Sequence, residues 1–202
     1  MNARTWMIVG LLGALGVGLA AAGEVVTVPG SAIRYPASTE IQVDGKPVKL
    51  SLTGAALRKR GPFSVYTVAS YLQDGVAAKT PEQLAIADGV KVLHLIMERD
   101  VKGRDMAEAI QSGVRLNNPG NAFEAELREI VQKLGSMDLR KGDNVFLIAI
   151  PRVGVRCQVV GKTDVLIQNP SLSRAIWDIY LGRQNIGEPI KAGLVSRIKS
   201  DG

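Results

Sequence analysis

The chain has 202 residues, a formal net charge of +6 at pH 7 and 46% hydrophobic residues, which is typical of a mildly basic globular protein of about one domain. Aromatic residues make up only 4% of the chain, so few side chains could stack on bases, and we expect no nucleic-acid partner. The single cysteine, Cys157, excludes an intramolecular disulfide, and the single histidine, His94, argues against a tight zinc or copper site. We expect neither a metal nor a cofactor.

The first 23 residues have the pattern of a secretory signal peptide. Arg4 supplies a positive start, residues 6–19 (WMIVGLLGALGVGL) form an apolar run, and residues 20–23 are small, as at a cleavage site. The alternative is an uncleaved anchor, because the apolar run is near the lower limit for spanning a bilayer. We therefore predict a signal peptide at 1–23, one domain at 24–202 with no stable membrane span after cleavage, and a periplasmic or secreted protein.

The first part of the predicted domain has the pattern of a sheet. Residues 25–43 alternate between apolar and polar, and Asp44-Gly45 indicates a two-residue hairpin that returns the chain into residues 47–52. Gly61-Pro62 marks another reversal. In the strand that follows, residues 63–72 alternate, which places Val65 on one face and Tyr66 on the other.

A short helix and a central strand follow. Thr80-Pro81-Glu82-Gln83 has the capping pattern of a helix start, and residues 90–99 are apolar on both faces, as in a strand inside a sheet. His94 shares one face of that strand with apolar residues, so a packed histidine is favoured over a catalytic one. Cys157, in a later alternating strand, is interpreted as a small buried thiol.

Two helices are predicted in the middle of the chain. Met106, Ile110 and Val114 recur at helical spacing, and a second stripe follows at Phe123, Leu127, Ile130 and Leu134. We expect Asn121 to cap the second helix and Gly135 to end it. Its outer face is expected to pair Glu124 with Arg128 and Glu129 with Lys133.

The last third combines strands with two helices. Strands are predicted at 144–150, 154–160 and 163–168, with Gly161-Lys162 as a tight turn between the last two. Asn169-Pro170 starts a helix through Leu181, and a final helix is predicted at 188–198. The hairpin turns make the sheet mainly antiparallel. The fold class is therefore α+β, with a layer of helices on one face of the sheet.

Three segments resemble the chalcone isomerase-like family, in the order expected for it. "LTGAALRKRGPFSVYTVASYL" is similar to its Gly-Ala-x-x-Arg strand end followed by an aromatic strand. "LRKGDNVFLIAIPRVGVRCQVVGKTD" resembles its Lys-Gly-Asp strand and hairpin, and "SLSRAIWDIYLGRQNI" resembles its Trp-containing helix. Together they span residues 52–186 and point to an exported bacterial branch. The resemblance implies a chalcone isomerase-like fold with a ligand cleft between the sheet and the helices.

The same resemblance implies two ligand-binding residues. In relatives the arginine of Gly-Ala-x-x-Arg meets an anionic ligand group, and the matching residue is Arg58; in the fatty-acid-binding members a tyrosine shares the carboxylate, and Tyr66 is the best match. From the residues alone, the run Arg58-Lys59-Arg60 has another interpretation, a solvated strand end beside a turn. Lys59 and Arg60 keep that interpretation.

The resemblance favours a binder over an enzyme. Where the plant isomerases carry a catalytic tyrosine and an asparagine, the nearest residues here are Asp105 and Ser112, and Ile179 stands where they carry a threonine. The expected partner is thus a small amphipathic ligand such as a fatty acid, with no catalytic residues. Two alternatives stay open: an isomerase or lyase acting on an unsaturated carbonyl substrate, and a structural envelope protein.

Overall fold

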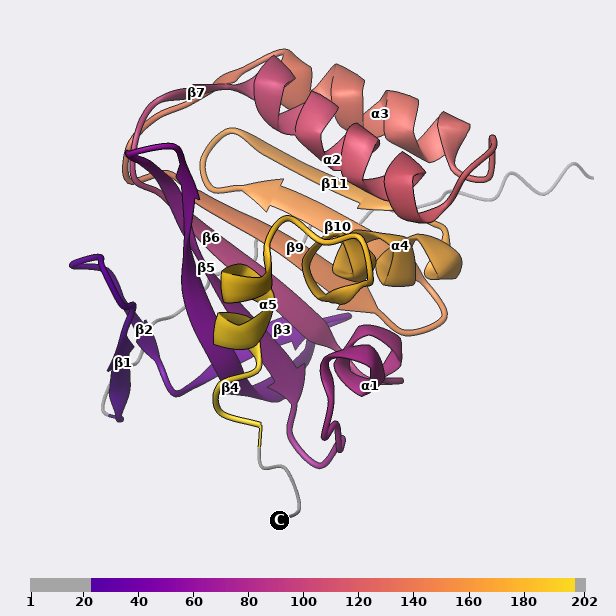
Figure 1. The fold of residues 1–202 in the computed structure, drawn as a ribbon. Helices are drawn as coiled ribbons and strands as arrows, with labels where there is room; N and C mark the ends of the chain where they lie inside the picture. Colours follow the sequence, from indigo (N-terminus) through magenta and orange to yellow (C-terminus); the bar gives the residue numbers. More distant parts are fainter. Residues whose placement is uncertain (1–22, 199–202) are drawn as a thin grey trace, which may run out of the picture.

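The computed structural model describes residues 23–198 and folds them into a seven-stranded sheet, two small ribbons and five helices (Figure 1). The predicted signal peptide lies outside these residues, except for Gly23. Among the described helices, none has the length and apolar composition needed to cross a bilayer.

The large sheet is antiparallel throughout, as its hairpin turns predicted. Its strand order is β11-β10-β9-β6-β5-β4-β3, with β6 at the centre. The strands are β3 (Ser38–Val43), β4 (Lys46–Arg60), β5 (Phe63–Gln73), β6 (Lys91–Met97), β9 (Asn144–Ile150), β10 (Gly154–Val159) and β11 (Thr163–Ile167). The ribbons pair β1 (Val25–Thr27) with β2 (Arg34–Pro36), and β7 (Val101–Lys102) with β8 (Asp138–Leu139).

The turns show how local sequence sets the strand register. Asp44 and Gly45 both have positive φ, 51° and 73°, and connect paired residues of β3 and β4, so the predicted two-residue hairpin is confirmed. The β10–β11 turn is one residue longer than predicted, because Val159 pairs with Thr163. The amide of Val160 still donates to the carbonyl of Asn144, in register with β9, although Val160 belongs to the turn toward β11.

Five helices lie in the described part of the chain: α1 (Pro81–Ile86), α2 (Gly103–Asn117), α3 (Glu124–Gly135), α4 (Pro170–Leu181) and α5 (Glu188–Leu194). The predicted caps of two of them are confirmed. Thr80 accepts a hydrogen bond from the amide of Gln83 at the start of α1, and Asn169 accepts one from the amide of Ser171 at the start of α4. Each of these helices has a proline in its first turn, where a missing amide hydrogen costs nothing.

Two details of the predicted α3 are wrong. The residue preceding the helix is Phe123, whereas Asn121 lies two positions earlier and offers only its backbone carbonyl to the amide of Glu124. Glu124 also has a different partner from the predicted Arg128. Arg115, at the end of α2, donates two hydrogen bonds to it, of 2.9 and 2.8 Å, so this carboxylate connects two helices.

The last helix ends at Leu194, four residues before the predicted Ile198. Thr53 of β4 explains the early end, because it forms hydrogen bonds with backbone groups that would pair with adjacent turns in a longer helix. Its hydroxyl donates to the carbonyl of Leu194 at 2.9 Å, and its own carbonyl accepts from the amide of Arg197 at 2.9 Å. Tertiary hydrogen bonds therefore replace the final helical turn.

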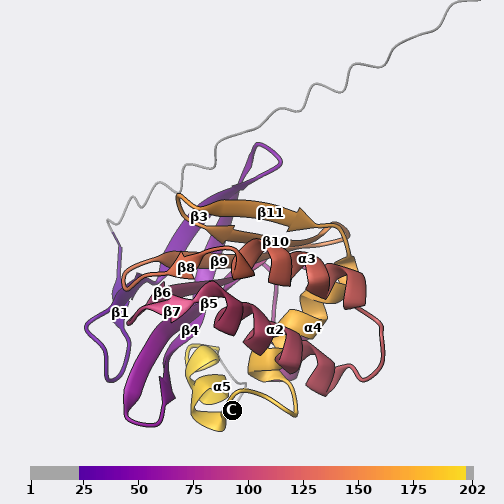
Figure 2. The same cartoon turned by 90° about the horizontal axis from the view of Figure 1, so that it is seen from above.

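The helices cover one face of the sheet and share a core with it, as predicted (Figure 2). The opposite face has its own apolar cluster, in which Tyr35 of the β1–β2 ribbon packs onto the sheet. His94 lies there, 8% exposed, with its ring stacked on Phe146 and Nε2 at 2.8 Å from Oδ1 of Asn144. The predicted packed histidine is therefore confirmed, and burial lowers its pKa to about 4. Cys157 is buried, as predicted.

A close approach of α5 to β4 explains the glycine of Gly-Ala-x-x-Arg. Gly54 follows a register shift in β4 and has a φ of 155°, which side-chain-bearing residues rarely adopt. A Cβ atom at this position would lie 2.1 Å from the carbonyl oxygen of Gly193. Only glycine lets the backbones of β4 and α5 touch here.

We expect Gly54→Ala to lower the free energy of unfolding by roughly 3 kcal/mol, because it combines backbone strain with a backbone clash. Chemical denaturation measures the change. Gly135→Ala is the matched control, since a Cβ there meets only an ordinary contact at 3.9 Å, and it should leave stability equal or slightly higher. Equal stability of the two variants would contradict the close approach.

Candidate functional site

The pairing of β4 with β5 brings the two predicted ligand-binding residues together. Arg58 and Tyr66 are directly opposite each other in the antiparallel register, and such pairs point to the same face of a sheet. That face is the helical one, because Tyr66 and Ala56 both belong to the core beneath the helices. The structure thus places Arg58 and Tyr66 side by side, facing the helical layer.

A bulge changes the alternation of β5 at this point. The register shifts between Arg58 and Lys59, which face Tyr66 and Ser64, so Val65 is the extra residue of β5. The sequence alternation predicted Val65 on the face away from Tyr66. Instead, both residues line the same cleft. The bulge therefore adds an apolar side chain to the cleft wall.

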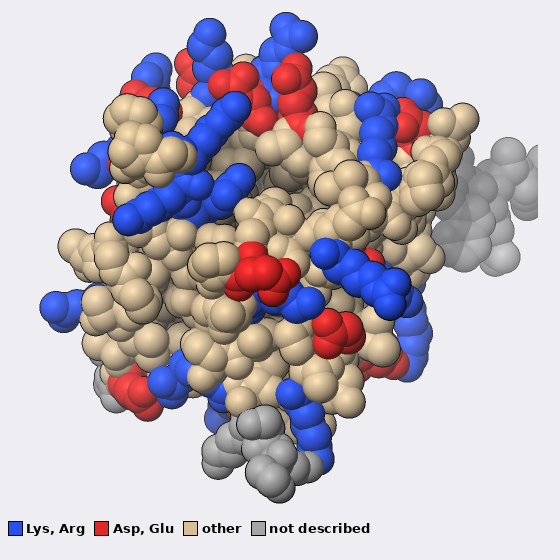
Figure 3. Space-filling model, viewed as in Figure 1, with Lys and Arg blue, Asp and Glu red and all other residues tan. Residues whose placement is uncertain are grey.

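The cleft lies between this end of the sheet and the first two turns of α2. It has a volume of about 740 Å³, within the roughly 300–1,000 Å³ of typical ligand pockets. Its lining divides into an apolar part, with Val65, Tyr66, Val101, Met106, Ala109, Leu139 and Ile186, and a charged part, with Arg58, Arg60, Arg99, Asp100, Lys102, Asp105, Asp138 and Arg140. Figure 3 shows Lys and Arg side chains gathered beside a hollow at this end of the molecule.

Arg58 has spare hydrogen-bonding capacity. Its guanidinium donates one hydrogen bond, of 3.2 Å, to the carbonyl of Lys59, and no ion pair among residues 23–198 includes it. A guanidinium carries five N–H donors and keeps its charge at any working pH. Arg58 is half-buried, whereas Lys59 is exposed. Arg60, which the sequence left with the solvated strand end, lines the cleft as well.

Behind the cleft wall, Tyr66 contacts a second phenol, that of the buried Tyr180 of α4. Burial raises the pKa of Tyr66, while the contact with Tyr180 and the charge of Arg58 act in the opposite direction. Burial likewise raises the pKa of Tyr180, and the neighbouring Tyr66 raises it further. Both phenols are therefore neutral at pH 7 and able to donate hydrogen bonds. The sequence reasoning did not single out Tyr180.

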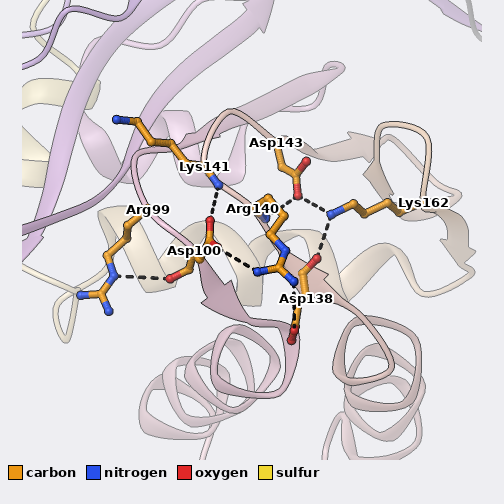
Figure 4. Close-up of polar contacts among 7 residues, drawn as sticks. All are labelled: Arg99, Asp100, Asp138, Arg140, Lys141, Asp143 and Lys162. Atoms are coloured by element: carbon orange, nitrogen blue, oxygen red, sulfur yellow. Dashed lines mark hydrogen bonds and ion pairs between the residues drawn. The ribbon is translucent and has the colours of Figure 1, made fainter.

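A charged network braces the other wall of the cleft (Figure 4). Asp100 accepts hydrogen bonds of 2.8 Å from the guanidinium of Arg140 and 2.9 Å from the amide of Lys141. Asp143 accepts from the amide of Arg140 at 2.6 Å and from Nζ of Lys162 at 2.5 Å. Since Lys162 lies in the β10–β11 turn and Asp100 follows β6, the network connects segments far apart in sequence.

The sequence contained only a weak signal for this wall. The charged run Glu98-Arg99-Asp100 directly after the central strand marks a strand end, but strand ends are often charged without function. Asp138, Arg140 and Lys102 come to the cleft through the β7–β8 pairing, between segments more than 30 residues apart.

The residues that stand where the plant isomerases have catalytic groups do not form a polar relay. Asp105 lines the cleft, on the first turn of α2. Ser112 is exposed, one residue before Gly113, and Ile179 is buried against Gly113 in the contact between α4 and α2. Ile179 therefore serves helix packing.

Two other cavities are less suited to an anionic ligand. A cavity of about 180 Å³ on the opposite face is lined mainly by apolar residues, together with Thr39, Tyr71, His94 and Asn144, and by no Asp, Glu, Lys or Arg. Another, of about 410 Å³, lies between the end of α1 and the start of α4. Its cations are engaged: Lys91 donates to the carbonyl of Ala85, Arg152 pairs with Asp88, and Arg174 pairs with Asp178.

Comparison with known proteins gives one family and one fold. The profile of the chalcone isomerase-like family matches residues 31–196. Among solved structures, the fatty-acid binding protein AtFAP1 of Arabidopsis thaliana superposes with a TM-score of 0.66 at 18% identity, over 86% of this chain and 96% of that one. This likeness confirms the predicted α+β fold. No curated protein sequence matches the chain.

We expect Lys162→Met to raise the pKa of Asp143 and to lower the free energy of unfolding by about 1 kcal/mol. Burial alone would raise the pKa of Asp143, but the contacts with Lys162 and Arg140 outweigh it and keep the pKa low. NMR titration of the carboxyl carbons measures the first effect and denaturation the second. Lys133→Met, on the exposed face of α3, is the control and should change neither. An unchanged Asp143 pKa would show that Lys162 does not hold this wall.

Proposed function

The chain belongs to the chalcone isomerase-like family, and from that premise we propose that it is an exported, non-catalytic protein that binds a fatty acid or a similar amphipathic carboxylate in the cleft. One observation carries the proposal: the half-buried guanidinium of Arg58, which has no ion pair among residues 23–198, faces a cleft whose lining is partly apolar.

The carboxylate end of such a ligand matches the polar groups at Arg58. A guanidinium offers a planar fork of donors to the two carboxylate oxygens, and such charge-assisted hydrogen bonds contribute roughly 1.5–3 kcal/mol. Tyr66, directly across the strand pair, is a neutral phenol that can donate to the same group. Arg58 and Tyr66 together would fix the orientation of the ligand.

The aliphatic end matches the apolar part of the lining. Met106 and Ala109 from α2, Leu139 from β8 and Ile186 from the α4–α5 connection face the cleft opposite the strands. Each methylene buried there contributes about 0.8 kcal/mol, so the tail would dominate the affinity. A fatty-acid binding protein with the same fold, AtFAP1, supports this choice of ligand class.

Binding is favoured over catalysis because, of the three positions that correspond to catalytic groups of the plant isomerases, only Asp105 lines the cleft. Ser112 is exposed and Ile179 is an apolar packing residue. A purely structural role is disfavoured because the space beside Arg58 is an open cleft rather than one filled by aromatic side chains.

Export is proposed from residues 1–23, whose positive start, apolar run and small residues favour signal cleavage into a periplasmic or secreted protein. Intact-mass measurement of the protein from an exporting bacterial host is expected to show an N-terminus at or close to residue 24. A mass that retains the apolar run would favour the anchor instead.

We expect Arg58→Ala to weaken binding of a long-chain fatty acid by at least about tenfold, because the carboxylate loses its charged partner. Native mass spectrometry of protein purified without detergent identifies any bound acid, and titration with a fluorescent fatty acid gives the affinity. Tyr66→Phe should weaken binding by a smaller factor, since it removes one neutral hydrogen bond.

Lys59→Ala is the matched control, because Lys59 is the adjacent cation of the same strand and does not line the cleft. It should bind the acid as tightly as the unchanged protein. Equal affinities for Arg58→Ala and Lys59→Ala, or no acid bound by any of them, would overturn the proposed site.

A further inference from the structure

The tip of the β4–β5 hairpin exposes an aromatic side chain. Phe63, the first residue of β5, is 62% exposed directly after the Gly61-Pro62 turn. Single exposed apolar residues are ordinary on protein surfaces, and Leu116 and Leu166 are examples here. What distinguishes Phe63 is its charged surroundings.

Four exposed cations are positioned around this tip. Lys59 and Arg60 precede the turn on β4, Arg99 follows β6, and Lys102 belongs to β7. Arg60 is paired directly with Phe63 across the hairpin, and the guanidinium of Arg99 lies 5.7 Å from the centre of the Phe63 ring. Figure 3 shows the corresponding group of Lys and Arg side chains beside the hollow.

These cations are not neutralised by the neighbouring acids. Within residues 23–198, no ion pair includes any of the four. The nearby carboxylates have other partners: Asp100 binds Arg140 and the amide of Lys141, and Glu98 accepts from the hydroxyl of Ser31. The tip therefore presents cations that have no ion pair among the described residues, beside an exposed ring.

We propose that this tip is a docking surface for an anionic phospholipid bilayer, with the Phe63 ring inserted at the headgroup level and the four cations against the lipid phosphates. Aromatic rings are favoured at membrane interfaces, and cations near an anionic surface add attraction that salt weakens. A duplex or single-stranded nucleic acid fits less well, because one ring at a hairpin tip forms no groove along which a backbone could run.

The tip lies next to the cleft, which connects the docking surface with the candidate ligand site. Arg60, Arg99 and Lys102 line the cleft, and the first two also lie beside Phe63, so docking would bring the cleft mouth to the bilayer surface. An amphipathic acid dissolved in the bilayer presents its carboxylate at that surface. The inference goes beyond the proposed function and does not depend on it, because the docking needs no ligand in the cleft.

The experiment is sedimentation of the mature protein, residues 24–202, with vesicles of phosphatidylcholine alone and of phosphatidylcholine mixed with phosphatidylglycerol. We expect binding to the mixed vesicles only, and weaker binding as salt is raised. Lys59→Gln combined with Arg60→Gln should weaken it by about 30-fold, the equivalent of about 1 kcal/mol for each cation. Phe63→Ser should weaken it by about tenfold or more.

Matched controls separate the tip from general charge and hydrophobicity. Lys46→Gln combined with Lys49→Gln removes two exposed cations from the other end of β4, and Leu166→Ser removes an exposed apolar side chain from β11. Both should bind vesicles as the unchanged protein does. Thermal unfolding of each variant verifies that it is folded.

Equal binding to the two kinds of vesicle, no binding to either, or equal losses in tip and control variants would each overturn the proposal. Fatty-acid titration of Phe63→Ser distinguishes it from the proposed function, since Phe63 does not line the cleft. Retained acid affinity with lost vesicle binding supports the docking surface. Vesicle binding by a protein that takes up no acid would leave the docking standing and reject the fatty-acid proposal.

Discussion

The register between β4 and β5 is the constraint on which the candidate site depends. It sets Arg58 opposite Tyr66 on the helical face, and the bulge beside them turns Val65 toward the same cleft. A one-residue slip would send the guanidinium to the opposite face. Two features act against such a slip: the Gly61-Pro62 turn at one end, and the contact of Gly54 with α5 farther along β4. The residues that flank Arg58 therefore help to fix the register between β4 and β5.

Several of the cations that line the cleft have no ion pair among the described residues. Some cations elsewhere have partners, as Arg115 has Glu124 and Lys162 has Asp143, while others, such as Lys46 and Lys49, have no ion pair among the described residues. Around the β4–β5 tip, Arg58 and its neighbours have none among the described residues. Leaving cations unpaired forgoes little stability at a surface, where an ion pair contributes roughly 0–1 kcal/mol. It does keep donors available for an anion, whether a single carboxylate in the cleft or the phosphates of a lipid surface.

Much of the fold was predictable because its signals are local. Asp44-Gly45, Thr80-Pro81 and Asn169-Pro170 act through the backbone of a few adjacent residues, and the two-faced apolar pattern of 90–99 requires a central strand wherever the sheet lies. The errors occur where a distant segment competes for the same groups. Thr53 ends α5 early by binding Leu194, and Arg115 takes the carboxylate expected to pair with Arg128. Neither partner is visible in a short sequence window.

The sequence by itself determined the α+β class, the antiparallel hairpins, the packed states of His94 and Cys157, and, through the family resemblance, Arg58 and Tyr66 as the residues to examine. Only the tertiary structure decided that these two are neighbours, that Val65 joins them, that Tyr180 contacts Tyr66, and that Arg99, Lys102 and Arg140 converge on the same cleft. The physical reason is that alternation and capping follow from nearest neighbours. Whether a bulge or a cleft forms, and whether a charge is paired, depends instead on contacts with segments that are far away in the sequence.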